Sequence, residues 1–131
     1  MGADLYRELI LEHYKNPHNF GEIADADITQ EGDNPLCGDM ITMYLKLDDG
    51  KLGAVKFRGR GCAISQASAS ILTDMVVGRP VDELKHFPTR ELLDELGIPI
   101  SPARMKCATL SVNTLRVALR GDADSEDGEA N

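Results

Sequence analysis

Two runs of alternating apolar and polar residues, joined by a tight-turn signal, constrain the fold of this chain most strongly. Apolar residues recur at every second position from Ile41 to Leu47 and again from Val55 to Phe57, which is the period of a strand with one buried face. Asp49-Gly50 lies between the runs, and Asp-Gly favours a two-residue hairpin turn because both central positions need positive φ. We therefore predict an antiparallel hairpin in which Asp48 pairs with Lys51.

Helical periodicity dominates much of the remaining chain. Five segments carry apolar residues at spacings of three and four and are bounded by glycine, proline or asparagine. We predict helices at residues 4–16, 63–77, 81–86, 89–96 and 102–120. Asp4 is expected to cap the first helix and Gly97 to end the fourth. The polar stretch 20–36 has room for one short strand near Asp25–Thr29.

Length and composition indicate one domain followed by an acidic tail. The chain has 131 residues, of which 42% are hydrophobic, enough to build a single core. Its net charge is −8, and residues 121–131 contain five acidic and no basic side chains. We predict a folded domain at 1–120 and a disordered tail at 121–131.

Composition also narrows the expected location and partners. No apolar run approaches the roughly 20 residues of a membrane span, and residues 1–11 lack the continuous apolar stretch of a signal peptide. The default expectation is a cytoplasmic protein without membrane association. The sequence has no basic stripe, so a nucleic-acid partner is not expected.

Three cysteines, Cys37, Cys62 and Cys107, are the main clue to function. Each occurs singly, and an odd number argues against a disulfide framework. Carried on without a break, the hairpin register places Cys37 opposite Cys62, with Asp39 on the same face as Cys37. Cys62 directly precedes a predicted helix, and Cys107 lies in the first turns of another. Three thiols and a carboxylate make a four-ligand set for zinc, Fe(II) or a thiolate-bound cluster.

The composition of this ligand set predicts a site that exchanges a ligand. Aspartate is a hard ligand among soft thiolates, so we interpret the site as labile rather than closed. A released thiol is a nucleophile, and Arg60, Arg104 and Lys106 can hold it as a thiolate. Such a thiolate can accept sulfane sulfur as a persulfide. The histidines are expected not to bind metal. They are His13 in the first helix, His18 in a turn and His86 on the surface.

Four segments of the chain resemble the U-type iron–sulfur cluster assembly proteins, the family of IscU, SufU and the N-terminal domain of NifU. The segments are Tyr14–Asn19, Asn34–Asp39, Gly59–Ser68 and Arg104–Ala108. Their order and spacing also match the family. The resemblance implies an α+β fold of the SufE/NifU type, in which a small three-stranded antiparallel sheet has about five helices packed on one side.

The resemblance further implies a ligand set, two mechanisms and a set of partners. The ligands carried over are Cys37, Asp39, Cys62 and Cys107, which hold zinc, or Fe²⁺ and a transient [2Fe–2S] cluster. The implied partners are a cysteine desulfurase of the SufS or IscS type and a downstream scaffold or apo iron–sulfur protein. In the SufU-like mechanism, a desulfurase histidine takes zinc from one cysteine and the released Cys37 accepts sulfur. In the IscU-like mechanism, Cys107 more often receives it and a [2Fe–2S] cluster is built in place.

Different features inside the resemblance favour different subfamilies. Arg104 and Lys106 look like SufU, because IscU proteins carry a ligating histidine at the position of Lys106. The interval of 45 residues between Cys62 and Cys107 is typical of IscU, whereas Ile100–Arg104 replaces the chaperone-recognition segment of that subfamily. The motifs favour SufU-like sulfur transfer, with IscU-like scaffolding and a structural zinc module as alternatives, and leave open whether the protein is an enzyme. The candidate catalytic residues are Cys37, Cys107, Arg104 and Lys106.

Overall fold

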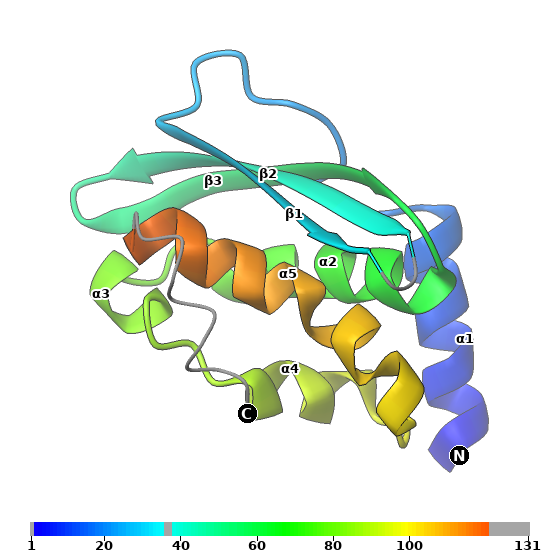
Figure 1. Cartoon of the computed structure of the whole chain (residues 1–131). Helices are drawn as coiled ribbons and strands as arrows, with labels where there is room; N and C mark the ends of the chain where they lie inside the picture. Colours follow the sequence, from blue (N-terminus) through cyan, green and yellow to red (C-terminus); the bar gives the residue numbers. More distant parts are fainter. Residues whose placement is uncertain (1, 36–37, 121–131) are drawn as a thin grey trace.

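A computed structural model describes residues 2–35 and 38–120. Within those ranges the chain forms five helices and three strands. In chain order they are α1 (Gly2–Lys15), β1 (Ile28–Asn34), β2 (Asp39–Asp48), β3 (Lys51–Arg60), α2 (Ala63–Val76), α3 (Val81–Leu84), α4 (Thr89–Leu96) and α5 (Pro102–Arg120). The strands make one antiparallel sheet in the order β1-β2-β3, and the helices lie on one side of it (Figure 1). The predicted α+β class is confirmed.

The central hairpin forms at the predicted turn. Asp49 and Gly50 both have positive φ, at 54° and 78°, which is the backbone of a type I′ turn. Asp48 pairs with Lys51, as predicted. The alternating apolar residues of β2 and β3 point toward the helices and form the sheet side of the core. Those buried most completely are Ile41, Met43, Leu45, Leu52, Val55 and Phe57.

The register predicted for the far end of this hairpin is wrong by one residue. Leu47 pairs with Leu52, but Lys46 pairs with Ala54, so Gly53 is the extra residue of a β-bulge. Every described pair beyond the bulge follows the shifted register, as far as Met40 with Arg60. The expected pairing of Cys37 with Cys62 rested on an unbroken ladder, and that ladder is not present. Cys37 itself lies outside the described residues.

Strand β1 lies nearer to the metal-ligand candidates than predicted. It runs from Ile28 to Asn34 rather than near Asp25–Thr29, and its last residue pairs with Asp39 of β2. The polar sequence of β1 gives little strand signal. The strand forms because it pairs with β2 and packs on α5. Gly32 permits that packing, because a Cβ there would lie 2.1 Å from Oγ1 of Thr114.

Helix α2 is enclosed by the rest of the fold. It packs against α1, α5 and β3, and nearly all its residues between Ser65 and Val76 are buried. Its alanines and serines are small, which permits this close approach on several sides. The helix begins at Ala63 directly after Cys62 and therefore fixes where that cysteine lies.

The predicted helices are confirmed with small changes at their ends. Helices α4 and α5 have the predicted bounds, and Gly97 ends α4 with a φ of 70°. Helix α1 begins at Gly2, so Asp4 lies inside it and is not its cap. Helix α3 ends at Leu84, two residues early, and α2 ends one residue early. The predicted tail, residues 121–131, lies outside the described residues.

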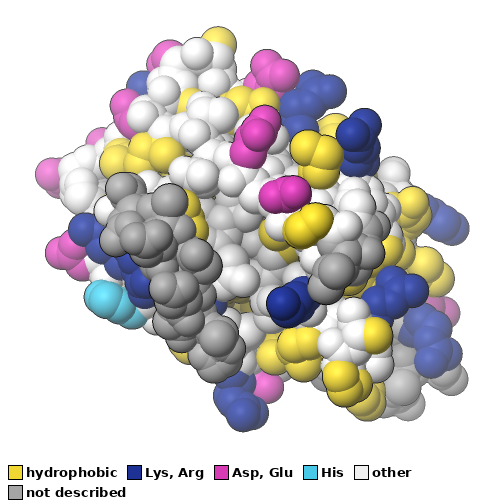
Figure 2. Space-filling view, in the orientation of Figure 1, with side chains coloured by type: hydrophobic (Ala, Val, Ile, Leu, Met, Phe, Trp, Pro, Cys, Tyr) yellow, Lys and Arg dark blue, Asp and Glu magenta, His cyan; other side chains and the backbone are white. Residues whose placement is uncertain are grey.

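The surface is mixed in charge. Figure 2 shows acidic and basic side chains interspersed with apolar ones over the face that it presents. In the part of the chain that the structure describes, no helix combines the length and the apolar character needed to cross a bilayer.

Candidate metal centre

Asp39 joins the sheet to the start of α2. It is the first residue of β2, and only 1% of it is exposed. Its Oδ1 accepts a hydrogen bond of 2.9 Å from the backbone N–H of Cys62, the N-cap residue of α2. One of the N–H groups at this end of the helix is thus satisfied by a carboxylate from another element, where the helix dipole also favours negative charge.

Gly61 makes this contact possible. Its φ is +143°, a conformation that side chains disfavour. A Cβ at this position would lie 2.1 Å from Oδ1 of Asp39 and 2.9 Å from its Cα. The backbone of residue 61 therefore passes against the Asp39 carboxylate at a distance that only glycine allows.

Two cysteines meet this carboxylate from separate helices. The Sγ of Cys62 lies 3.5 Å from Oδ2 of Asp39. Cys107 comes from the second turn of α5, and 1% of it is exposed. One carboxylate oxygen of Asp39 and the two sulfurs all lie within 4.8 Å of one another. The structure thus brings together three of the four predicted ligands, and we call Asp39, Cys62 and Cys107 the thiol centre.

The thiol centre has a donor set that fits a soft or borderline metal ion. Two sulfurs and one carboxylate oxygen are ligands that zinc and iron accept. Cys62 directly precedes the first turn of α2. Cys62 is partly exposed and Cys107 is buried, so an ion can reach the centre from one side. The predicted fourth ligand, Cys37, lies outside the described residues and stays a prediction.

The predicted basic residues lie around the centre rather than in it. Arg104 and Lys106 are exposed on the first turns of α5. Arg60, the last residue of β3, donates from Nη2 to Sδ of Met40 at 3.5 Å. The catalytic roles of Arg104 and Lys106 remain predictions.

A groove of about 1020 Å³ runs beside the thiol centre. Lys106, next in sequence to Cys107, lies in its wall, as do Asn34 and Pro35 at the end of β1. Asn34 is the residue that pairs with Asp39. The start of α4 and the length of α5 as far as Arg116 form the rest of the wall. The groove thus adjoins sequence neighbours of the ligands, while Asp39, Cys62 and Cys107 do not line it.

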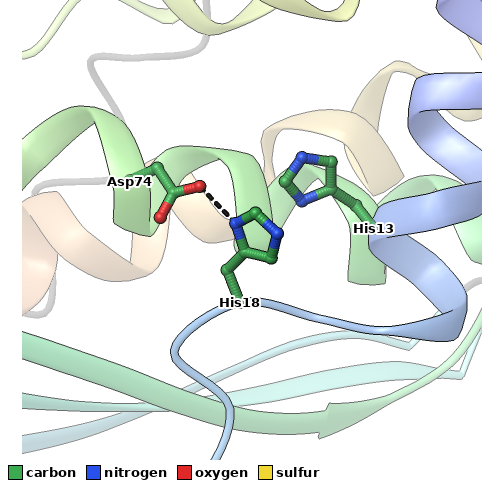
Figure 3. A group of neighbouring side chains, drawn as sticks. All are labelled: His13, His18 and Asp74. Carbon is green, nitrogen blue, oxygen red and sulfur yellow. Dashed lines mark hydrogen bonds and ion pairs between the residues drawn. The ribbon is translucent and has the colours of Figure 1, made fainter.

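A second group of potential ligands was missed by the sequence analysis. His13, His18 and Asp74 lie together between the end of α1 and α2 (Figure 3), with one ligand atom from each within 4.8 Å of the others. His13 and His18 were assigned to their elements correctly, but as residues without a ligand role. No short motif connects them with Asp74, which follows His18 by 56 residues, so the sequence carried no signal for this group.

Comparison with known proteins settles the family. The family model described as the NifU-like N terminal domain matches residues 5–122. The chain belongs to this family. The match includes all four ligand candidates and every strand and helix except the first residues of α1.

Relatives of both subfamilies resemble the chain over most of their length. A zinc-dependent sulfurtransferase SufU from Bacillus subtilis is 38% identical over 143 aligned residues, covering 95% of this chain and 93% of the relative. An iron–sulfur cluster assembly scaffold protein IscU from Thermotoga maritima is 37% identical, covering 88% of this chain and 93% of the relative. The chain is thus almost equally similar to a relative named SufU and to a relative named IscU.

Solved structures show the same fold. A putative iron–sulfur cluster assembly scaffold protein for the SUF system from Fervidobacterium islandicum has a TM-score of 0.73 at 30% identity, covering 90% of this chain and 99% of that one. A NifU-like protein N-terminal domain from Brucella abortus has a TM-score of 0.72 at 26% identity, covering 92% of this chain and 96% of that one.

Proposed function

We propose that this protein assembles iron–sulfur clusters by accepting sulfane sulfur from a cysteine desulfurase at a metal centre made of Cys37, Asp39, Cys62 and Cys107. The observation that carries the proposal is the thiol centre, in which two sulfurs and a carboxylate oxygen lie within 4.8 Å of one another. Membership of the family and the zinc-dependent sulfurtransferase among the relatives support it.

Zinc fits this donor set as the resident metal. Asp39, Cys62 and Cys107 would hold it, with Cys37 as the proposed fourth ligand. When bound, the metal would keep the cysteines as thiolates at neutral pH. The hydrogen bond between Oδ1 of Asp39 and the N–H of Cys62 leaves Oδ2 on the side of the Cys62 sulfur, so the same carboxylate can cap the helix and face the metal.

Sulfur transfer requires one of the cysteines to act as a nucleophile. Its thiolate attacks the outer sulfur of the desulfurase persulfide, and a new S–S bond forms. The S–S bond inside the desulfurase persulfide breaks, and the desulfurase cysteine leaves as a thiolate that takes up a proton. We propose Cys37 for this role and Cys107 as the alternative, since Cys107 is 1% exposed and must become accessible before it can react.

Arg104 and Lys106 are proposed to favour this transfer electrostatically. Both are exposed cations at the start of α5, and Lys106 lines the groove beside the centre. There they can attract an anionic persulfide and stabilise the thiolate that receives it. The partner's persulfide-bearing segment would approach through this groove.

The test is a reaction of the pure protein with a cysteine desulfurase and cysteine. We expect faster desulfurase turnover and one added sulfur atom on Cys37, located by mass spectrometry without reductant. Replacing Cys37 with serine should abolish the added sulfur, whereas the Lys106→Ala variant should slow its appearance. If turnover is unchanged and no persulfide forms on Cys37 or Cys107, the sulfur-acceptor function is wrong, and a structural zinc module becomes the better account.

Scaffolding is the second candidate function, because the chain is 37% identical to a relative named as a scaffold. In this case the [2Fe–2S] cluster is the cargo that the ligands hold and release. Anaerobic incubation with iron and sulfide should then give a visible chromophore that moves to an apo-ferredoxin. The Lys106→His variant supplies one more ligand beside Cys107, and we expect it to lengthen the lifetime of the chromophore several-fold. Retention of zinc with stimulated desulfurase would instead favour sulfur transfer.

A further inference from the structure

His13, His18 and Asp74, which we call the histidine cluster, lie outside the thiol centre. His13 comes from the last turn of α1, His18 from the turn that follows, and Asp74 from the last turn of α2. Figure 3 shows His18 between the other two side chains, with one ring edge toward Asp74 and the other toward His13. Asp74 follows Cys62 by twelve residues, which is about 18 Å along a helix axis. The two clusters are therefore separate.

Hydrogen bonds hold His13 and the His18 backbone in place. Nδ1 of His13 lies 2.6 Å from Oγ of Ser70, and the backbone N–H of His18 donates to the same oxygen at 2.8 Å. One buried serine on α2 thus anchors both histidines. The two imidazole rings lie 4.4 Å apart between centroids.

The turn that carries His18 is fixed at its other end as well. Nδ2 of Asn19 donates to Oδ1 of Asp74 at 3.0 Å. The backbone carbonyl of Asn19 accepts a bond of 3.0 Å from the N–H of Phe57 in β3. His18 itself contacts Asp74 through Nδ1 at 2.6 Å. The cluster is accordingly placed by three elements before any ligand binds.

The cluster has the donors and the access that a transition metal needs. Imidazole nitrogens and a carboxylate are ligands for zinc and its neighbours in the first transition series. His13 is 7% exposed, whereas the side chains of His18 and Asp74 are 49% and 46% exposed. One wall is thus fixed in the interior, and the other side is open to an incoming ion.

We propose that His13, His18 and Asp74 form a second metal site, for zinc or a similar borderline divalent cation, separate from the thiol centre. Ligand atoms on a tetrahedral zinc lie roughly 3.3 Å apart, so atoms now within 4.8 Å need only a small inward movement. The ion would replace the proton shared between His18 and Asp74. Three protein ligands leave a fourth position for water, and the bound ion would link α1 to α2.

The NMR signals of the imidazole rings report zinc binding at this site and not at the thiol centre, because none of the thiol centre's proposed ligands is a histidine. The full chain, labelled with ¹⁵N, would be titrated with zinc beyond the first equivalent while the ring nitrogens of its three histidines are observed. We expect the signals of His13 and His18 to shift with the second equivalent. His86, exposed on the turn after α3, is the internal control and should not respond.

Matched variants test whether the affinity for the second zinc depends on the histidine cluster. His18→Gln should weaken binding of the second zinc at least tenfold in calorimetry, and Asp74→Asn should weaken it similarly, while His86→Gln should leave it unchanged. Amide spectra of each variant would check that the fold is retained. The proposal is overturned if the His13 and His18 rings do not respond to zinc, or if His18→Gln and His86→Gln bind the second zinc equally well. Either result would leave the cluster as a hydrogen-bonded contact between α1 and α2.

Discussion

Two clusters of potential metal ligands lie near opposite ends of α2, and they differ in burial and in chemistry. The thiol centre, at the N-terminal end, combines two sulfurs with a carboxylate that is 1% exposed. The histidine cluster, near the C-terminal end, combines two imidazoles with a carboxylate whose side chain is 46% exposed. One helix therefore positions two groups of potential ligands that differ in burial and in donor type.

The largest expected effect is on metal binding at the thiol centre. Replacing Cys107 with serine removes a buried sulfur ligand, and we expect zinc affinity to fall by more than about a hundredfold, since even outer-shell changes cost up to that factor. Competition with a chromogenic chelator would measure it. His86→Gln is the control. Equal affinity in the cysteine variant and the parent would show that Cys107 is not a ligand.

Gly61→Ala should disturb the same centre through the backbone. The new Cβ would meet Oδ1 of Asp39 at 2.1 Å, and the positive φ adds strain of about 1–3 kcal/mol. We expect lower stability in urea and weaker zinc binding together. The matched control is Gly78→Ala, because Gly78 also has positive φ but has open space around its Cβ position. If both variants lose equal stability, the contact with Asp39 is not the cause.

Asp39 variants separate helix capping from metal binding. In metal-free protein, Asp39→Ala leaves the N–H of Cys62 without its acceptor, and we expect a loss of about 1–3 kcal/mol in the free energy of unfolding. Asp39→Asn keeps an oxygen acceptor and should lose less. Both variants should bind zinc more weakly. A stability of Asp39→Ala equal to that of the parent would contradict the capping role.

The smallest expected effect is a pH dependence at the histidine cluster. Burial, together with the nearby His18, lowers the pKa of His13 below its ordinary value of 6.5, while Asp74 and Glu12 oppose the shift. Below pH 6.5 the unfolded chain therefore binds more protons at this position, so the free energy of unfolding should fall as the pH decreases.

Chemical denaturation between pH 7.5 and 5, in the presence of a chelator, would measure this dependence. His13→Gln should flatten the slope relative to the parent, and His86→Gln should not. A parent protein whose stability rises as the pH falls from 6.5 to 5.5, with no difference in His13→Gln, would contradict the assignment.

Local sequence patterns predicted most elements because their causes are local. Asp49-Gly50 forms a turn by its own backbone preference, Gly97 ends α4 in a left-handed conformation, and the start of α2 follows Cys62 as expected. Strand β1 was misplaced because its polar residues are held by β2 and α5, which are distant in sequence. The bulge at Gly53 was missed although the pattern marks it, because the apolar step from Leu52 to Val55 spans three residues and only the shifted register pairs Met43 with Phe57.

The sequence by itself determined the ligand types, the hairpin turn, the helix that follows Cys62 and, through family resemblance, the fold. Only the tertiary structure decided which ligands meet. Cys107 reaches Asp39 because α5 packs beneath the sheet, and the bulge in the hairpin sets the register in which Asp39 lies beside Gly61. His13 and Asp74 become neighbours because α1 packs on α2. The sequence specifies each side chain directly, whereas the distance between residues far apart in the sequence depends on how whole helices and strands pack.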